Sequence, residues 1–121
     1  ALALQEERLA TNRALGDADG IGAALWDIAQ LHFRQERVGD AVPCIVEAYP
    51  IVERLGRAAG IAAIGPLYGQ ILIAKDRRDE GLAVLQRAAE AARMIGLAEQ
   101  ATNIDNLRQT LENDASDAGE T

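Results

Sequence analysis

Apolar residues recur every three or four positions along most of the chain, and glycines or charged turns interrupt them at regular intervals. Ile21, Leu25 and Ile28 form one such stripe, and Ile61 and Ile64 begin another. Spacing of this kind predicts amphipathic helices. The expected fold is all-α, with helices over about 1–15, 20–36, 41–55, 58–75, 80–95 and 98–113.

Glycine and aspartate mark the turns between these helices. Gly16, Gly56 and Gly96 follow three of the predicted helices, and glycine is the usual residue just beyond a helix end. Aspartate is a good N-cap because its carboxylate accepts a hydrogen bond from a free backbone N–H. The caps are therefore expected at Asp17 or Asp19, Asp40 and Asp79.

The chain contains an internal repeat of 40 residues. Residues 15–54 align with residues 55–94 without a gap, and nine of the 40 aligned positions are identical. A third start follows at Ile95-Gly96. A fixed period of about 20–50 residues is typical of a stacked repeat array, in which each unit buries its apolar face against its neighbours.

The repeat predicts the domain organisation. Residues 1–113 are expected to form one helical repeat domain, and residues 114–121 an acidic, flexible tail. Within the domain we expect the second helix of a truncated repeat at 1–15, complete repeats at 16–55 and 56–95, and a capping helix at 96–113. Since the chain starts within a helical pattern, we expect it to be a segment of a longer protein.

Composition and charge narrow the classes of function. Hydrophobic residues make up 49% of the chain but aromatic residues only 3%, which favours closely packed, alanine-rich helices. The net charge of −7 argues against binding nucleic acid or an anionic membrane. No apolar run approaches the ~20 residues of a membrane span. The single cysteine, Cys44, cannot form an internal disulfide, so we expect a reducing, cytoplasmic location.

Small residues recur at the positions where paired helices would cross. Ala29, Ala41 and Ala48 keep spacings of 12 and 7, and the next unit repeats those spacings at Gly69, Gly81 and Ala88. Over residues 1–112 this pattern resembles the tetratricopeptide repeat family. The junction at 15–20 is similar to the 40-residue variety found in kinesin-light-chain-like arrays and bacterial signalling regulators. The resemblance implies an α-solenoid of antiparallel helix pairs, wound as a right-handed superhelix.

The resemblance also implies a function and a surface for it. Such arrays line a concave groove with the first helix of each unit and act as scaffolds that bind a peptide or a partner helix, within larger signalling or regulatory proteins. Transferred to this sequence, the groove residues are Trp26, Gln30, Phe33, Arg34, Gln70, Ile73, Asn103 and Asn106, with Ala23 and Pro66 beside them. The alternative for Trp26 and Phe33 is that they pack against a neighbouring helix.

Two further functions stay open as alternatives. The first helix has no preceding partner helix, so Leu2 and Leu9 would face water and would favour self-association into a homo-oligomer. Pro50 and Pro66 are expected to kink their helices, and a kinked array would open a pocket for a small ligand, as in a sensor domain.

Catalysis is not expected. His32 is the only histidine and lies on an apolar face, where a core role is expected, and Cys44 is expected to be a buried structural thiol. The segment Asp17-Ala18-Asp19-Gly20 lacks the closing glutamate of a calcium loop and is interpreted as a turn. We therefore expect no enzyme, no cofactor and no metal site.

Overall fold

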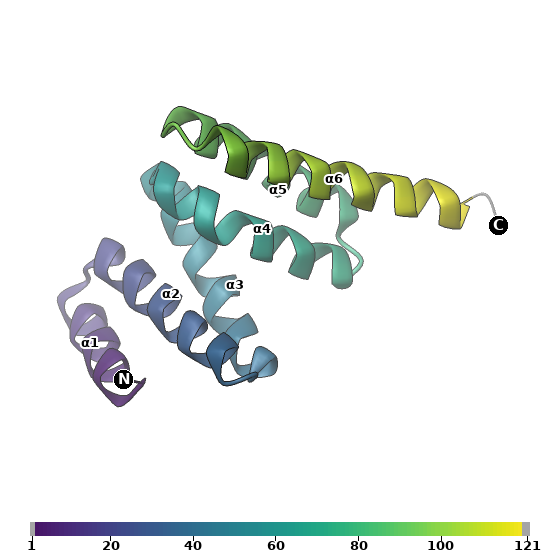
Figure 1. The fold of residues 1–121 in the computed structure, drawn as a ribbon. Helices are drawn as coiled ribbons and strands as arrows, with labels where there is room; N and C mark the ends of the chain where they lie inside the picture. Colours follow the sequence, from purple (N-terminus) through teal and green to yellow (C-terminus); the bar gives the residue numbers. More distant parts are fainter. Residues whose placement is uncertain (1, 120–121) are drawn as a thin grey trace. The chain divides into compact units, whose positions relative to one another are not determined.

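The structure, a computed structural model, describes the backbone of residues 2–119 and the side chains of residues 2–114. Within residues 2–119 it contains six α-helices and no strand (Figure 1), so the predicted all-α fold is confirmed. The helices are α1 (Leu2–Leu15), α2 (Ala18–Arg34), α3 (Val38–Leu55), α4 (Ala58–Ala74), α5 (Arg78–Met94) and α6 (Ala98–Gly119). They divide into two compact units: unit 1 ends at Arg57, and unit 2 begins at Ala58.

The 40-residue period is present in the helix boundaries. Helix α2 begins at Ala18 and α4 at Ala58, and α3 and α5 begin 40 residues apart, at Val38 and Arg78. Consecutive helices within each unit pack against each other. Helices joined by such short turns run antiparallel. The sequence repeat therefore corresponds to a structural repeat of helix pairs.

All five turns use the same hydrogen bond. One residue in each turn has a left-handed backbone, and the N–H of the following residue donates to the carbonyl five positions earlier, as in Asp17 to Asn12 at 3.0 Å and Arg37 to His32 at 2.8 Å. Three of the left-handed residues are the predicted glycines. The other two are Glu36 and Asp76, with φ of 58° and 66°, although an L side chain disfavours this conformation.

Two predicted helix caps are wrong. Helix α3 follows Arg37 and α5 follows Arg77, and neither preceding residue makes a side-chain capping bond. The left-handed turn residues reverse the chain early, so each helix starts before the aspartate expected to cap it. Asp40 and Asp79 lie instead in the first turns, where a carboxylate favours the helix dipole. Asp17 does cap α2, since its Oδ1 accepts from the Gly20 N–H at 3.1 Å.

The last helix is longer than predicted. The sequence placed its end at Asn113, whereas α6 continues to Gly119. Residues 114–118 contain neither glycine nor proline, and extending an existing helix is easy once it is nucleated. Asp114 to Gly119 are therefore helical, and the flexibility expected of the 114–121 tail stays a prediction. Glu120 and Thr121 lie outside the described residues.

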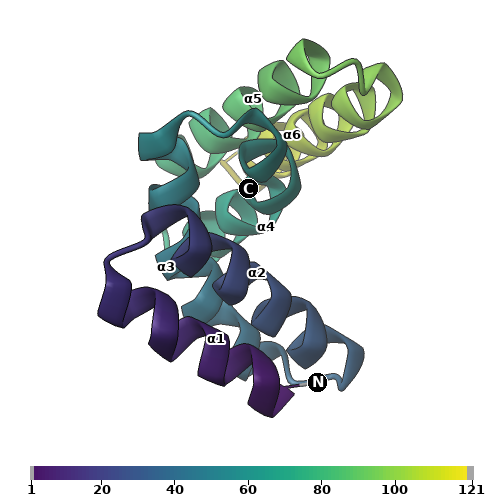
Figure 2. The same ribbon diagram turned by 90° about the vertical axis from the view of Figure 1, so that its left-hand side faces the viewer.

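Helices α2 and α3 pack against each other in unit 1 (Figure 2). The small residues Ala29, Ala41 and Ala48 on these two helices are fully buried. Helix α1 contributes no buried residue, and an ion pair ties it to α3. In that pair both guanidinium Nη atoms of Arg13 donate to the carboxylate of Glu47, at 2.6 and 2.9 Å. Helix α1 is thus the most weakly embedded element of the unit.

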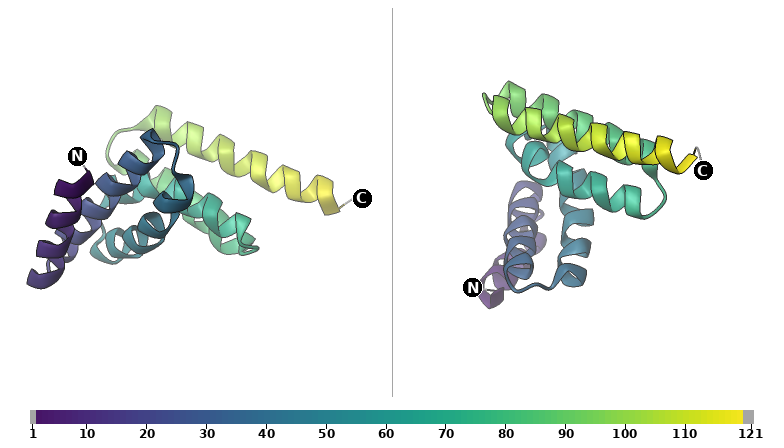
Figure 3. Two further views of the ribbon diagram at one scale, coloured as in Figure 1. Left: turned by 90° about the horizontal axis from the view of Figure 1, so that it is seen from below. Right: turned by 45° about the vertical axis from the view of Figure 1, so that its right-hand side comes forward.

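Unit 2 packs its helices more closely, and α6 lies along α5 (Figure 3). Gly69 and Gly81 face each other where α4 and α5 cross, and neither leaves room for a Cβ atom. Ala101 and Ile104 of α6 are buried in the same core. On its polar side α6 carries Asp105, which accepts from Arg93 of α5. Helix α6 therefore has one apolar side packed on the core of unit 2 and one polar side.

Candidate binding pocket on unit 1

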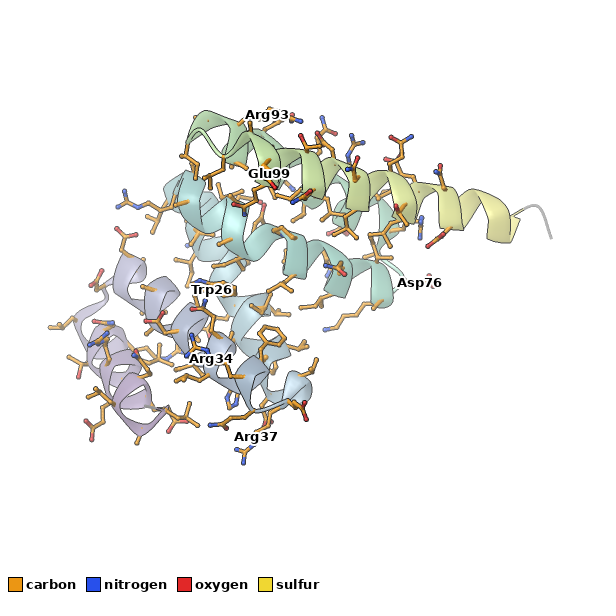
Figure 4. All side chains as sticks on the ribbon, viewed as in Figure 1. Trp26, Arg34, Arg37, Asp76, Arg93 and Glu99 are labelled. Carbon is orange, nitrogen blue, oxygen red and sulfur yellow. The ribbon has the colours of Figure 1, made fainter. Side chains whose placement is uncertain are left out.

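Helix α2 carries the first four residues of the predicted groove. Trp26 and Phe33 are half-buried, Gln30 is half-buried, and Arg34 is exposed. Figure 4 shows Trp26 and Arg34 along this helix. The spacing of four between Gln30 and Arg34 places them on one face. The burial of the two aromatic side chains is intermediate and therefore leaves both their packing role and their binding role open.

A surface pocket joins α2 to α1. Its volume is about 310 Å³, at the lower end of the range typical of ligand sites. Its lining contains two of the predicted residues, Gln30 and Arg34, together with Asp27 and Leu31 of α2 and Gln5 of α1. The α2 members follow the helical spacing of three, four and seven, so a single face of that helix forms one wall.

The polar side chains of this pocket have no ion-pair or hydrogen-bond partner in the part of the chain whose side chains are described. Among the described residues, neither Asp27 nor Arg34 makes an ion pair, and Gln30 makes no side-chain hydrogen bond. The Oε1 atom of Gln5 is buried and receives no hydrogen bond. A buried acceptor without a donor costs free energy. The pocket therefore presents an anion, a cation and two amides that a ligand can satisfy.

Sequence reasoning missed two residues of this site. Asp27 lies three residues before Gln30 and seven before Arg34, so the helical spacing alone could have identified it. Gln5 could not have been found in that way. Its place in the pocket depends on how α1 packs on α2, which the repeat pattern does not specify.

In unit 2, the structure gives two predicted groove residues other contacts. The Nε2 atom of Gln70 donates to the carbonyl oxygen of Pro66 at 2.9 Å, within its own helix. Ile73 is half-buried and packs toward Gly81 across the α4–α5 crossing. These contacts favour a structural role for Ile73, and they occupy part of the hydrogen-bonding capacity of Gln70.

The two predicted asparagines of α6 are exposed. Asn103 lines a second, shallower pocket at the start of α6, together with residues 96–100. Asn106 lies outside that pocket, and its carbonyl oxygen accepts from the Thr110 hydroxyl at 2.9 Å. Of the four groove residues predicted in unit 2, Asn103 alone lines this pocket.

The predicted self-association residues are less exposed than expected. Leu2 and Leu9 are half-buried, and α1 packs against α2. The exposed leucines of α1 are Leu4 at 55% and Leu15 at 75%. Self-association through Leu2 and Leu9 stays a prediction.

His32 and Cys44 show no arrangement for chemistry. The Nδ1 atom of His32 is buried without a hydrogen-bond partner, so no base or orienting carboxylate bonds it. Burial, with the nearby carboxylates of Glu47, Asp40 and Glu6, raises the pKa of the Cys44 thiol. A raised pKa lowers the thiolate fraction and makes the group a poor nucleophile.

The described residues contain neither a metal-binding cluster nor a membrane-spanning helix. No group of three or more His, Cys, Asp or Glu side chains among them is arranged to hold a metal ion. None of the helices in that part of the chain is both long and apolar enough to cross a membrane. Comparison with protein-family models, curated proteins and solved structures found no match to the chain.

Proposed function

We propose that the chain is a protein-interaction module that presents α2 of unit 1 to a peptide or a partner helix. One observation carries the proposal: Gln30 and Arg34 line the same pocket with polar groups that have no partner among the described residues. An arginine in such a position is ready to bind a carboxylate through two parallel hydrogen bonds. The amide of Gln30 can both donate to and accept from a peptide main chain.

The aromatic residues of α2 complete this surface. Trp26 and Phe33 keep part of their side chains accessible, and Trp and Arg are enriched among the residues that dominate binding energy. A peptide on α2 would place apolar side chains against these rings and polar groups against Gln30 and Arg34. The rigid helix would supply the geometry, so little ordering cost would fall on the module.

The wider identity belongs to the same proposal. The period of 40 residues in the helix bounds and the close crossing at Gly69 and Gly81 support a tetratricopeptide-type array. The proposal includes a right-handed superhelix and a role as a scaffold in a larger, cytoplasmic signalling protein. No catalytic step, cofactor or nucleic acid enters this function.

The test is a peptide selection followed by matched substitutions. Random peptides flanked by linkers at both ends are selected on the immobilised chain, and the affinity of the best binder is measured by fluorescence anisotropy. Trp26→Ala and Arg34→Ala should each weaken binding about tenfold or more. Arg54→Ala, an exposed arginine on α3, is the control and should leave the affinity unchanged. Equal binding to all four proteins would show that α2 is not the surface.

Self-association is the second candidate, and a different observation favours it. Leu15 and Met94 are exposed at 75% and 80%, and exposed apolar side chains on a small chain are often covered by a partner. Sedimentation equilibrium at high concentration tests it. A dimer that Leu15→Gln or Met94→Gln dissociates would support this candidate, and a monomer throughout would remove it.

A further inference from the structure

We propose that the pocket between α1 and α2 binds a dipolar ligand, a dipeptide or tripeptide with both ends free. Its ammonium group would bind Asp27 and Gln5, and its carboxylate would bind Arg34. This inference goes beyond the proposed function, because it assigns a free short peptide, and not a segment of a partner protein, to a pocket on the same surface.

The charges in the pocket carry the first step. Asp27 and Arg34 line the same pocket with opposite charges, and Gln30 lies between them on the same helix. Asp27 and Arg34 are seven residues apart on α2, which corresponds to a helix rise of roughly 10 Å between their Cα atoms. Neither forms an ion pair with a described residue of this unit. A ligand with one positive and one negative end therefore matches both groups at once.

Gln5 of α1 lines the same pocket as Asp27. Its Oε1 atom is shielded from solvent and has no donor among the described residues, so this amide turns toward the pocket when a ligand donor binds it. A ligand ammonium group has three N–H donors. It can therefore pair with the carboxylate of Asp27 and satisfy Gln5 together. The ligand carboxylate then lies toward Arg34, whose guanidinium presents a two-pronged donor.

Size and lining restrict the ligand to a short peptide. An extended chain spans about 3.3–3.6 Å per residue, so two or three residues match the ~10 Å of helix rise between Asp27 and Arg34. The peptide groups would lie beside the Gln30 amide, and one side chain would contact Leu31. The pocket volume of about 310 Å³ leaves no room for a folded domain. An interior segment of a protein carries neither terminal charge and would lose both ionic contacts.

The test is calorimetric titration of the whole chain with three probes. The probes are tri-alanine, its N-acetylated form and its C-terminal amide. Tri-alanine should bind, and removing either end charge should weaken the affinity about tenfold or more, since each charge-assisted hydrogen bond contributes at least that factor. Absence of binding by tri-alanine, or equal binding of all three probes, would overturn the inference.

Substitutions in the pocket test which residue binds each end of the ligand. Asp27→Asn should abolish the preference for a free amino group and keep the preference for a free carboxylate, and Arg34→Gln should do the reverse. Gln5→Leu should weaken tri-alanine and reduce the preference for a free amino group, and it should leave the preference for a free carboxylate unchanged. The controls are Glu7→Gln and Arg54→Gln, which remove one exposed charge each outside the pocket. Unchanged preferences in Asp27→Asn and Arg34→Gln would overturn the assignment, and circular dichroism confirms that each variant is folded.

The short-peptide inference and the proposed function can fail independently of each other. The peptides of the earlier selection have linkers on both ends, so they bind without free terminal charges. If those peptides bind α2 while tri-alanine does not, the short-peptide inference fails and the interaction module stands. If tri-alanine binds and no linked peptide does, the pocket is a small-ligand site and the interaction module fails.

Discussion

A Cβ atom built on Gly81 would lie 2.5 Å from the carbonyl oxygen of Gly69 and 2.7 Å from Cγ1 of Ile73. The opposite glycine is similarly crowded, since a Cβ on Gly69 would lie 2.9 Å from the carbonyl oxygen of Gly81. At both glycines a backbone carbonyl oxygen blocks the added Cβ atom, and a backbone oxygen cannot move aside as the end of a flexible side chain can. Helices α4 and α5 therefore cross at a distance that only glycine permits at these two positions.

Gly81→Ala should lower the free energy of unfolding by about 1–2 kcal/mol, because overpacking costs more than the helix propensity that alanine adds. Gly39→Ala is the matched control. A Cβ on Gly39 meets nothing within 4 Å, so this substitution in the first turn of α3 should stabilise the protein slightly. Urea unfolding of both variants measures the difference. A Gly81→Ala protein as stable as the parent would contradict the close crossing.

The left-handed turn residues predict a pair of substitutions with opposite signs. Gly56→Ala should destabilise the protein by about 1 kcal/mol, because an L side chain disfavours this backbone conformation. Glu36→Gly should be neutral or stabilising, since Glu36 already bears that strain with φ of 58°. Glu36→Ala keeps a Cβ and is the control, expected within about 0.5 kcal/mol of the parent. The melting temperatures of the three variants measure these changes in stability. A destabilised Glu36→Gly protein, or a Gly56→Ala protein as stable as the parent, would contradict the prediction.

The link between α1 and α3 should respond to acid. The hydrogen bonds from Arg13 hold the pKa of Glu47 below its usual range. A carboxylate with a lowered folded-state pKa stabilises the protein above its unfolded-state pKa, and this contribution disappears as the pH falls through the folded-state pKa. The pair is exposed, so its contribution is about 0.2–1 kcal/mol.

Glu47→Gln should therefore be less stable than the parent at neutral pH, and the two should become equally stable only when the pH has fallen below the lowered pKa of Glu47. Thermal unfolding across this range measures the difference. Glu7→Gln, which also removes one exposed carboxylate of unit 1, controls for net charge. A stability difference between Glu47→Gln and the parent that persists unchanged into acid would show that the ion pair is not its source.

Cys44 should resist alkylation. Burial and the nearby carboxylates raise its pKa, so little thiolate exists at neutral pH. Iodoacetamide should modify the native chain several-fold more slowly than the chain unfolded in urea. The variant Gln109→Cys in a Cys44→Ala background places the thiol at an exposed position and should react quickly when folded. Equal rates for Cys44 in the native and unfolded chains would contradict its shielding.

The sequence predicted the helices and their period well, because helix packing leaves local signals. Small residues such as Ala29 and Gly69 mark the crossings, and Gly16, Gly56 and Gly96 mark three of the turns. The two other turns were also predicted, but the helices after them were placed two or three residues late, because the left-handed residues Glu36 and Asp76 are not glycine. The same error misplaced the caps at Asp40 and Asp79, since a stronger local signal lay a few residues downstream.

The candidate site was predicted in part. Gln30 and Arg34 share a face by helical spacing alone, and the structure places both in one pocket. Gln5 enters that pocket through the packing of α1 on α2, which depends on tertiary contacts. Ile73 was assigned to the groove because helical position alone does not distinguish a free side chain from one packed on a neighbouring glycine.

Nuclear magnetic resonance mapping of backbone amides, during titration with a selected, linker-flanked peptide, tests the binding surface on α2. The largest shifts should fall on residues 26–34 of α2, with smaller shifts at Gln5 of α1. The matched titration of Arg34→Ala should lose most of these shifts, while that of Arg54→Ala should keep them. Shifts centred on α6, or on the exposed ends at Leu15 and Met94, would contradict the central claim that α2 of unit 1 is the binding surface.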